Sequence, residues 1–193
     1  MRVNEIFASL QGEGYHSGTP AVFVRLSGCN LACPFCDTVH DQYVVMDEDR
    51  IADIASSYGL PLAVVTGGEP ALQLNDRLVD CLHQRGMRVH VETNGTLPLP
   101  LGVDWITLSP KDAFLGDAAI PVLRRADELK VLYDGVHAID PYNAIETKHR
   151  FLQPVETNDP ERNAAIIRQA VEYCMDHPLW RLSLQIHKLI HIR

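Results

Sequence analysis

The 193-residue chain lacks the features of an exported or membrane-spanning protein. Residues 1–14 contain no apolar segment of the kind that forms the core of a signal peptide. No apolar run approaches the roughly 20 residues that a helix needs to cross a bilayer. We therefore expect a cytoplasmic protein with no membrane partner. In a reducing cytosol its five cysteines are better interpreted as metal ligands, reactive thiols or core residues than as disulfides.

Basic residues are scarce and scattered. The chain has 17 Lys and Arg against 25 Asp and Glu, which gives a formal net charge of -8, and Arg124 and Arg125 are its only adjacent basic pair. Nonspecific binding of nucleic acid requires clustered Lys and Arg side chains against the phosphates. Nucleic acid is therefore not an expected partner, although a local basic pocket for a small anion is compatible with this composition.

Two further absences concern organisation and chemistry. The chain has no internal repeat, no low-complexity segment and no linker between halves, and its 46% hydrophobic residues suffice for a buried core. It has no nucleophile elbow of the form G-x-S-x-G and no recognisable catalytic triad. We therefore predict one domain over residues 1–193 and assign no side chain as a catalytic residue.

The sequence does contain an alternation of short apolar runs and helix-like segments. Runs rich in Val, Ile and Leu predict strands at residues 21–26, 62–66, 88–92, 105–108, 128–133, 150–154 and 181–185. Helical spacing of apolar residues predicts helices at 47–58, 75–85 and 160–176, the last with Ile167, Ala170, Val171 and Cys174 on its apolar face. A closed eight-unit barrel needs about 250 residues. We therefore predict an α/β fold with a partial, open TIM-like barrel of parallel strands; a flavodoxin-like doubly wound sheet is the alternative.

Polar signatures follow several predicted strands at the point where each strand ends. The strand at residues 21–26 runs into SGCNLACPFCDT, and later strands run into GGEP, TNG and SPK. The carboxyl ends of parallel strands meet at one rim, where the sites of such sheets lie. We therefore expect these segments to form one site, with the cysteine-containing loop after the first barrel strand.

Cys29, Cys33 and Cys36 have the spacing C-x3-C-x2-C, so their thiolates can converge on one metal centre. Three cysteines around a cubane 4Fe-4S cluster leave one iron without a protein ligand, and that iron can bind a small molecule. The alternative is structural zinc, which usually takes four ligands, with His40 or Asp37 completing the set. The two remaining cysteines fall on apolar helix faces, where a free cysteine is usually a small core residue.

A glycine-rich segment, TGGEP at residues 66–70, follows the next predicted strand. Successive glycines let the backbone approach a ligand closely. The carboxylate of Glu69 offers acceptors for a cationic amino group. A strand followed by two glycines is also often only a tight turn. The position of TGGEP one β-α unit after the cysteines favours the ligand-binding interpretation.

The cysteine triplet, with the aromatic Phe35 before its last member, and the TGGEP segment together resemble the signature of the radical S-adenosylmethionine (SAM) superfamily. The resemblance implies that the three cysteines hold a 4Fe-4S cluster whose open iron chelates SAM. One electron then releases a 5′-deoxyadenosyl radical. The tasks left to the protein are to hold the cluster, to orient the cofactor and to keep water from the radical.

The resemblance narrows to one family and covers nearly the whole chain. It rests on EIFASLQGEG, RLSGCNLACPFCDT, VTGGEP, ETNGT, SPK, LQP and LSLQIHK, which are similar to the 7-carboxy-7-deazaguanine synthase family. This implies a lyase that converts 6-carboxy-5,6,7,8-tetrahydropterin to 7-carboxy-7-deazaguanine with loss of ammonia, in queuosine and 7-deazapurine biosynthesis. It also implies Mg²⁺ as a further cofactor, a homodimer, and an electron donor such as flavodoxin.

The resemblance also implies roles for individual residues. Substrate-binding positions are Leu10, Gln11, Gly12, Glu13, Arg25, Thr66, His187 and Arg193. Cofactor-binding positions are Phe35, Cys36, Asp37, Gly68, Ser109, Pro110, Lys111, Gln153, Pro154, Val155 and Glu156. Arg25 corresponds to the partner of the substrate carboxylate, whose geometry a guanidinium matches. Thr38 corresponds to the magnesium ligand, because a hydroxyl is a hard oxygen donor.

Simpler interpretations remain for single residues. The only role of Arg25 can be an ion pair with a neighbouring carboxylate of the protein. Lys111, which follows Ser-Pro, has the alternative of an exposed surface lysine. The chain also departs from the family's expected Q-T-H-K ending at Ile186, and it carries Arg193 where some members differ. Two other functions stay open: another radical SAM enzyme such as a glycyl-radical activase, and a zinc-binding interaction module.

Overall fold

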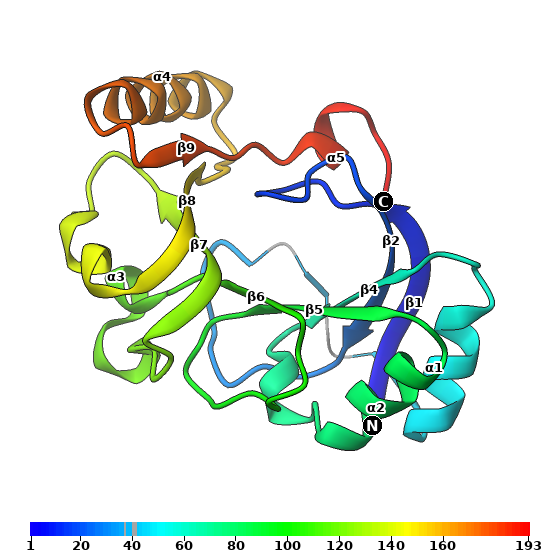
Figure 1. Ribbon diagram of the computed structural model, residues 1–193. Coiled ribbons are helices and arrows are strands. Elements are labelled where there is room, and N and C mark those ends of the chain that lie inside the picture. The colour runs from blue at the N-terminus through cyan, green and yellow to red at the C-terminus, as the bar shows by residue number, and fades with distance from the viewer. Residues whose placement is uncertain (37, 40–41) are drawn as a thin grey trace.

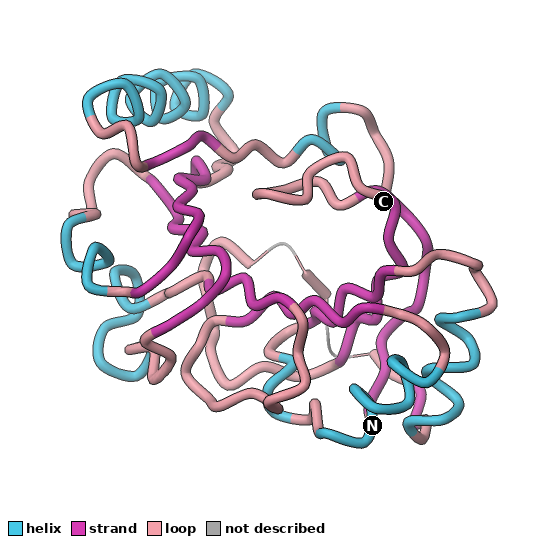
Figure 2. Tube along the Cα trace, in the orientation of Figure 1, coloured by secondary structure: helices cyan, strands magenta, loops and turns pink. Residues whose placement is uncertain are grey.

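The computed structural model describes residues 1–36, 38–39 and 42–193. In these residues a sheet of nine strands curves around a central space (Figures 1 and 2). The strands are β1 (Arg2–Leu10), β2 (Pro20–Leu26), β3 (Val44–Val45), β4 (Leu62–Gly67), β5 (Arg88–Thr93), β6 (Trp105–Leu108), β7 (Arg125–Tyr133), β8 (Glu146–Pro154) and β9 (Trp180–Leu182). Their order is β3-β1-β2-β4-β5-β6-β7-β8-β9. Neighbours from β2 to β9 are parallel, whereas β1 is antiparallel to both β2 and β3.

The sheet is a partial barrel. Its end strands, β3 and β9, are not paired with each other in the described chain, so the ring of strands stays open, as predicted. The C-terminal segment with the short helix α5 (Ile186–Leu189), red in Figure 1, runs from β9 back toward β1 and spans this opening. It is fastened there, because Ile186 N donates to Gly12 O at 2.9 Å and Ser9 Oγ donates to Arg193 O at 2.5 Å.

The three predicted helices are confirmed as α1 (Glu48–Ser56), α2 (Asp76–Gln84) and α4 (Pro160–Asp176). Each begins at a side chain that accepts from free backbone N–H groups of the first turn, namely Asp47, Asn75 and Asp159. Shorter helical turns are η1 (Pro70–Leu72), α3 (Asp112–Leu115), η2 (Gly116–Ala119) and η3 (Asp140–Ala144). No helix among the described residues is long and apolar enough to cross a membrane.

The face that α4 buries differs from the prediction. Ile166 and Ala170 are buried, whereas Ile167 and Val171 are 38% and 42% exposed. The apolar positions of this helix cover more than one stripe, so periodicity alone does not select the buried one. The contacts with β8 and β9 decide it.

Strand β1 lies outside the predicted strands. Only Val3 and Phe7 of its residues are buried, and the polar Asn4, Glu5 and Ser9 interrupt its apolar residues, so its apolar signal is weak. It is held by its antiparallel register with β2, in which Phe7 opposes Phe23 and the two rings stack at 5.2 Å. β1 thereby supplies a wall of the barrel that the parallel β-α pattern does not contain.

Alternation along β4 separates the core from the site. Ala63 and Val65 point to the outer core under α1 and α2, where they join Ile51 and Leu78. Successive side chains of a strand point to opposite faces, so Leu62, Val64 and Thr66 share the inner face. The strand thus delivers Thr66 to the interior of the barrel at its carboxyl end.

The β1–β2 connection, residues 11–19, reaches into the barrel. The Tyr15 ring lies 4.1 Å from that of His149, and the His16 ring lies 4.6 Å from that of His90. The rings of Tyr15, His90 and His149 stack on the indole of Trp105, and the His16 ring meets it edge-on. The interior below the site is therefore filled by aromatic and imidazole rings, which fix the connection at one end.

This packing predicts a pH-dependent stability. Burial lowers the pKa of His90 to about 4, and the charges of His16 and Arg88 add to this effect. Because the folded pKa is depressed, the unfolded chain binds more protons as the pH falls. His90 therefore contributes stability that is present above the ordinary histidine pKa and is lost between about pH 6.5 and about pH 4. We expect His90→Phe to reduce the stability difference between about pH 7 and about pH 5 by about 1–2 kcal/mol in urea unfolding. The exposed His177→Phe is the control, and an equal pH dependence in both variants would contradict the prediction.

Candidate active site

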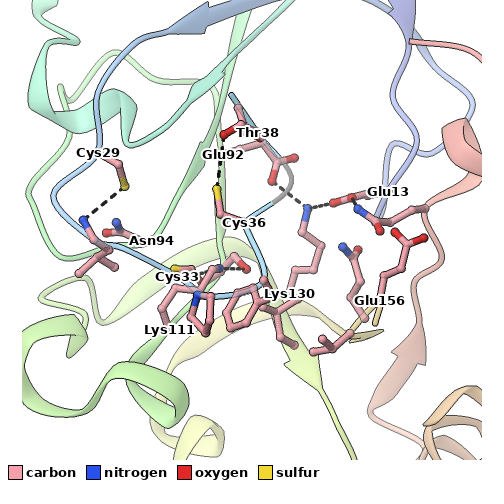
Figure 3. Close-up of a pocket in the computed structure, with 18 of the residues that line it drawn as sticks. Glu13, Cys29, Cys33, Cys36, Thr38, Glu92, Asn94, Lys111, Lys130 and Glu156 are labelled. Atoms are coloured by element: carbon pink, nitrogen blue, oxygen red, sulfur yellow. Dashed lines mark hydrogen bonds and ion pairs between the residues drawn. The ribbon is translucent and has the colours of Figure 1, made fainter. Parts of the chain in front are cut away.

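A cavity of about 1200 Å³ lies at the carboxyl ends of the parallel strands (Figure 3). We call it the thiol lobe, because Cys29, Cys33 and Cys36 line it. A second cavity of about 590 Å³, the hairpin lobe, is lined by residues 10–13 of the β1–β2 connection. Several residues line both cavities: Glu13, Thr38, Thr66, Glu92, Gln185 and Lys188. The two lobes therefore form one continuous site at the rim that the sequence predicts.

The three cysteines come from the loop that follows β2. Leu31 N donates to Cys29 Sγ at 3.4 Å, and Cys36 N donates to Cys33 O at 3.1 Å, so the loop turns its thiols inward. Burial raises the pKa of Cys29 and of Cys33, and the neighbouring thiols raise both further. Taken alone, these two are neutral thiols, and bound iron would favour the thiolate.

The donor set of this loop fits the predicted cluster. Among the residues that the structure covers, no three His, Cys, Asp or Glu side chains are arranged to hold a metal ion as they stand. The three thiols nevertheless share one cavity wall and interact electrostatically with one another. Asp37 and His40, which the zinc alternative requires, lie outside the described residues. Three thiols facing a cavity of this size suit a cluster with one open position better than a closed four-ligand zinc site.

The glycine-rich segment packs directly against the start of the cysteine loop. Gly68 N donates to Leu26 O at 3.1 Å and Glu69 N donates to Gly28 O at 2.9 Å. A Cβ at Gly68 would lie 2.3 Å from Gly28 O and 2.9 Å from Cys29 Cβ. Only glycine allows these two segments to approach so closely, and this approach brings Gly68 to the wall of the thiol lobe.

We expect Gly68→Ala to weaken SAM binding at least about 10-fold, because the methyl group meets backbone that cannot rotate away. Equilibrium binding of SAM to the iron-loaded protein measures the effect, and iron content reports whether the cysteine loop survives. Gly59→Ala is the control: its added Cβ meets no atom within 4 Å, and the backbone strain at its φ of 71° affects stability without placing any atom in the site. Unchanged SAM affinity in Gly68→Ala would show that this approach is not needed for the site.

The expectation that the Glu69 carboxylate contacts a ligand is wrong. Glu69 is 1% exposed and does not line either lobe. Its oxygens accept from Thr93 Oγ1 at 2.7 Å, Asn94 N at 2.7 Å and Ala71 N at 2.9 Å. These bonds tie the end of β4 to the end of β5. Glu69 therefore positions the rim, because its carboxylate is buried behind the lobe walls and binds backbone and side-chain donors of the protein.

The predicted cofactor positions lie mostly in the thiol lobe. Those that line it are Phe35, Cys36, Gly68, Ser109, Lys111, Gln153, Pro154, Val155 and Glu156. Pro110 lines neither lobe, and Asp37 lies outside the described residues. Lys111 is not a surface residue: its Nζ donates to Ser109 Oγ at 2.7 Å, and burial lowers its pKa to about 8. The lobe thus combines thiols, the Lys111 ammonium and strand-end polar groups.

All predicted substrate positions line the hairpin lobe, namely Leu10, Gln11, Gly12, Glu13, Arg25, Thr66, His187 and Arg193. They come from four separated stretches of the chain. Gly12 lies under the C-terminal segment, and a Cβ there would meet His187 Nδ1 at 2.1 Å. Thr38 lies at the junction of both lobes. The fold therefore gathers these residues around one volume.

Arg25 on β2 lines the hairpin lobe. Its Nε donates to Glu5 Oε1 at 2.8 Å, and its guanidinium lies 5.9 Å from the centre of the Phe7 ring. Glu5 also pairs with Arg193, whose guanidinium lies 4.6 Å from the same ring. The ion pair of the simpler interpretation is therefore present. The arrangement still leaves the guanidinium facing a cavity, where it can receive an anion.

Two charged residues at the centre of the site are absent from the predicted positions. Lys130 and Glu92 line the thiol lobe, and Lys130 Nζ donates to Glu92 Oε2 at 2.9 Å and to Glu13 Oε2 at 2.5 Å (Figure 3). The sequence carries a signal for both. Glu92 directly precedes TNG at a strand end, and Lys130 is a charge inside an otherwise apolar strand, where it is buried only if paired.

Comparisons with known proteins agree with this geometry. A family model described as the Radical SAM superfamily matches residues 23–177. The chain is 50% identical to the 7-carboxy-7-deazaguanine synthase of Bacteroides thetaiotaomicron over 193 residues, covering 100% of this chain and 98% of that protein. It is 42% identical to the 7-carboxy-7-deazaguanine synthase of Bordetella pertussis, with 98% of each chain covered. The crystal structure of QueE from Escherichia coli superposes with a TM-score of 0.79 and 28% identity, covering 96% of this chain and 94% of that one. This chain belongs to the radical SAM superfamily and, within it, to the 7-carboxy-7-deazaguanine synthase family.

Proposed function

We propose that this chain is a radical SAM lyase that converts 6-carboxy-5,6,7,8-tetrahydropterin to 7-carboxy-7-deazaguanine with loss of ammonia, in queuosine and 7-deazapurine biosynthesis. The observation that carries the proposal is the joining of the thiol lobe to the hairpin lobe. A cofactor held at the cysteines is thereby brought beside a pocket lined by carboxylates and guanidinium groups. Family membership and likeness over the whole chain support the same reaction.

The reaction requires a hydrogen to leave a carbon that is not acidic enough for a side-chain base. When bound, a 4Fe-4S cluster and SAM supply a 5′-deoxyadenosyl radical for this task. Cys29, Cys33 and Cys36 would hold the cluster. Gly68, Ser109, Lys111 and the strand end at Gln153 would orient the cofactor. The protein contributes no acid or base to this hydrogen transfer; it contributes placement.

The hairpin lobe would hold the pterin between two charged ends. Arg25 would receive the substrate carboxylate, because a guanidinium matches it with two parallel hydrogen bonds. Glu13 and Glu92 at the opposite end would accept from the N–H groups of the pyrimidine ring. The C-terminal segment with His187 covers the lobe and would exclude water from it.

Thr38 is proposed as the protein ligand of Mg²⁺, which would orient the substrate carboxylate and stabilise charge during ring contraction. Its position at the junction of the lobes supports this role. We expect Thr38→Ala to weaken the dependence of turnover on magnesium and to leave reductive cleavage of SAM intact. Titrating Mg²⁺ in both assays measures this, and an equal loss in the two assays would count against the assignment.

We also propose that residues 1–193 act as one domain in a cytoplasmic homodimer, and that a small reductant such as flavodoxin supplies the electron. The homodimer and the electron donor are implied by the family resemblance, whereas the single domain and the location are predictions from the sequence. Light scattering of the purified protein checks the dimer, which predicts twice the mass of 21.6 kDa.

Anaerobic turnover tests the function. The protein is reconstituted with iron and sulfide, then supplied with reductant, SAM, Mg²⁺ and the tetrahydropterin. We expect a brown protein that releases equal amounts of deazaguanine product and ammonia, with SAM acting catalytically. SAM cleavage without product would favour another radical SAM enzyme, such as a glycyl-radical activase. A colourless protein with one zinc would favour an interaction module.

A further inference from the structure

The middle of the barrel contains a buried lysine surrounded by carboxylates. Lys130 on β7 has a side chain only 5% exposed, and those of Glu13 and Glu92 are 15% and 21% exposed. Lys130 Nζ lies 2.5 Å from Glu13 Oε2 and 2.9 Å from Glu92 Oε2. Burying an ammonium group costs free energy unless it is paired with a carboxylate. These contacts therefore hold the Lys130 ammonium and the two carboxylates in place.

The second oxygen of each carboxylate is also fixed. Gln185 Nε2 donates to Glu13 Oε1 at 2.8 Å, and Gln11 Nε2 donates to Glu92 Oε1 at 3.0 Å. Each carboxylate is thus held by the charged Lys130 and by neutral donors, with Gln153 a further donor to Glu13. Figure 3 shows Glu13 and Lys130 side by side at the edge of the cavity. Each carboxylate oxygen has a further lone pair, so both groups can still accept from a ligand in the lobe.

We propose that Lys130 is a positioning residue that keeps Glu13 ionised and oriented as an acceptor for the N–H groups of the pterin ring. The inference rests on the proposed function, since it assigns Glu13 to the donor edge of that substrate. Lys130 does not touch the reacting carbon in this scheme. It acts through Glu13, which reaches the hairpin lobe from the β1–β2 connection.

The electrostatics of the site agree with this geometry. Burial raises the pKa of Glu13, but the charge and hydrogen bond of Lys130, with the bond from Gln185, outweigh burial and lower it to about 2. Besides Lys130, Glu128 on β7 and Lys111 after β6 interact electrostatically with Glu13, and Glu92 on β5 shares Lys130 with it. Arg25, His187 and Lys188 also line the hairpin lobe with Glu13. Without Lys130, burial and the two carboxylates would therefore raise the pKa of Glu13 above its ordinary value.

Substrate affinity as a function of pH tests the proposal. The dissociation constant of the tetrahydropterin is measured on the cluster- and SAM-loaded enzyme without reductant, so that no turnover occurs. The dissociation constant of each variant is divided by that of the wild type at the same pH. This ratio cancels the effect of protonation of the substrate itself. For Lys130→Met we expect this ratio to rise about 10-fold between about pH 8 and about pH 6, as Glu13 becomes protonated. Lys130→Arg keeps the charge and should give a flat ratio.

A double variant assigns the titrating group. Lys130→Met combined with Glu13→Gln should lose the acid-side rise, because the amide does not titrate. Lys148→Met, an exposed lysine on the adjacent strand β8, is the matched control and should behave as wild type. A flat ratio in Lys130→Met, or a rise that persists in the double variant, would overturn the proposal.

A second measurement does not depend on the folding of Lys130→Met. Infrared difference spectra of wild type minus Glu13→Gln at about pH 5 should show an ionised carboxylate; a protonated carboxyl band would overturn the proposal. Turnover by wild type separates the two levels of inference. If the wild type forms product and the ratio for Lys130→Met is flat, only the role of Lys130 is refuted. If the wild type neither binds nor converts the tetrahydropterin, the proposed function and the role of Lys130 are both refuted.

Discussion

Cys33→Ala is expected to abolish product formation, by at least about 10³-fold, and to bleach the visible absorption of the reconstituted protein. Cys33 lines the thiol lobe between the other two cysteines in sequence, and no further cysteine of the described residues lines that lobe. Two thiols cannot hold a cubane cluster with one open position. Iron content, visible absorption and turnover measure the result.

Cys174→Ala is the matched control for this experiment. Cys174 is partly buried against the core that contains Leu129, Leu152 and Trp180, far along the chain from the cysteine loop. Its replacement should keep iron and activity and cost about 1 kcal/mol of stability for the lost contact. A full iron content in Cys33→Ala, or its loss in Cys174→Ala, would mean that the cluster is held by other ligands.

Arg25→Ala is expected to lower kcat/KM for the tetrahydropterin by about 10²–10³-fold, mainly through a higher substrate requirement. Removing the guanidinium leaves the substrate carboxylate without its charged partner and leaves Glu5 facing the same lobe as a like charge. Cluster absorption and substrate-independent SAM cleavage should persist. Arg25→Lys should restore little, because an ammonium does not offer two parallel donors.

Arg125→Ala provides the comparison for a pair of the same chemistry on the surface. Arg125 and Glu146 lie 3.6 Å apart, and both side chains are about three-quarters exposed. We expect no change in kcat/KM in this variant. If Arg25→Ala had as little effect as Arg125→Ala, Arg25 would serve only its ion pair with Glu5.

Local patterns predict much of the site because each is contained in a few residues. The spacing of Cys29, Cys33 and Cys36 follows directly from the sequence, and runs of four to six residues rich in Val, Ile and Leu mark most parallel strands. The strand-end rule then brings these segments to one rim. The same reasoning fails for Glu69, because the sequence does not show whether a carboxylate in a glycine-rich loop accepts hydrogen bonds from a ligand or from the protein itself. Only its bonds to Thr93 and Asn94 show that the protein itself uses it.

What the sequence alone determined about this protein is therefore its chemistry. It places three thiols in one loop, it places glycines where the backbone approaches that loop closely, and it supplies too few parallel strands to close a barrel. What the tertiary structure decided is the pairing of charges across the barrel. Glu13 meets Lys130 across 117 positions and Gln185 across 172. No periodicity records such contacts, because they arise from the curvature of the sheet, which turns the inner faces of distant strands and the β1–β2 connection toward the same volume.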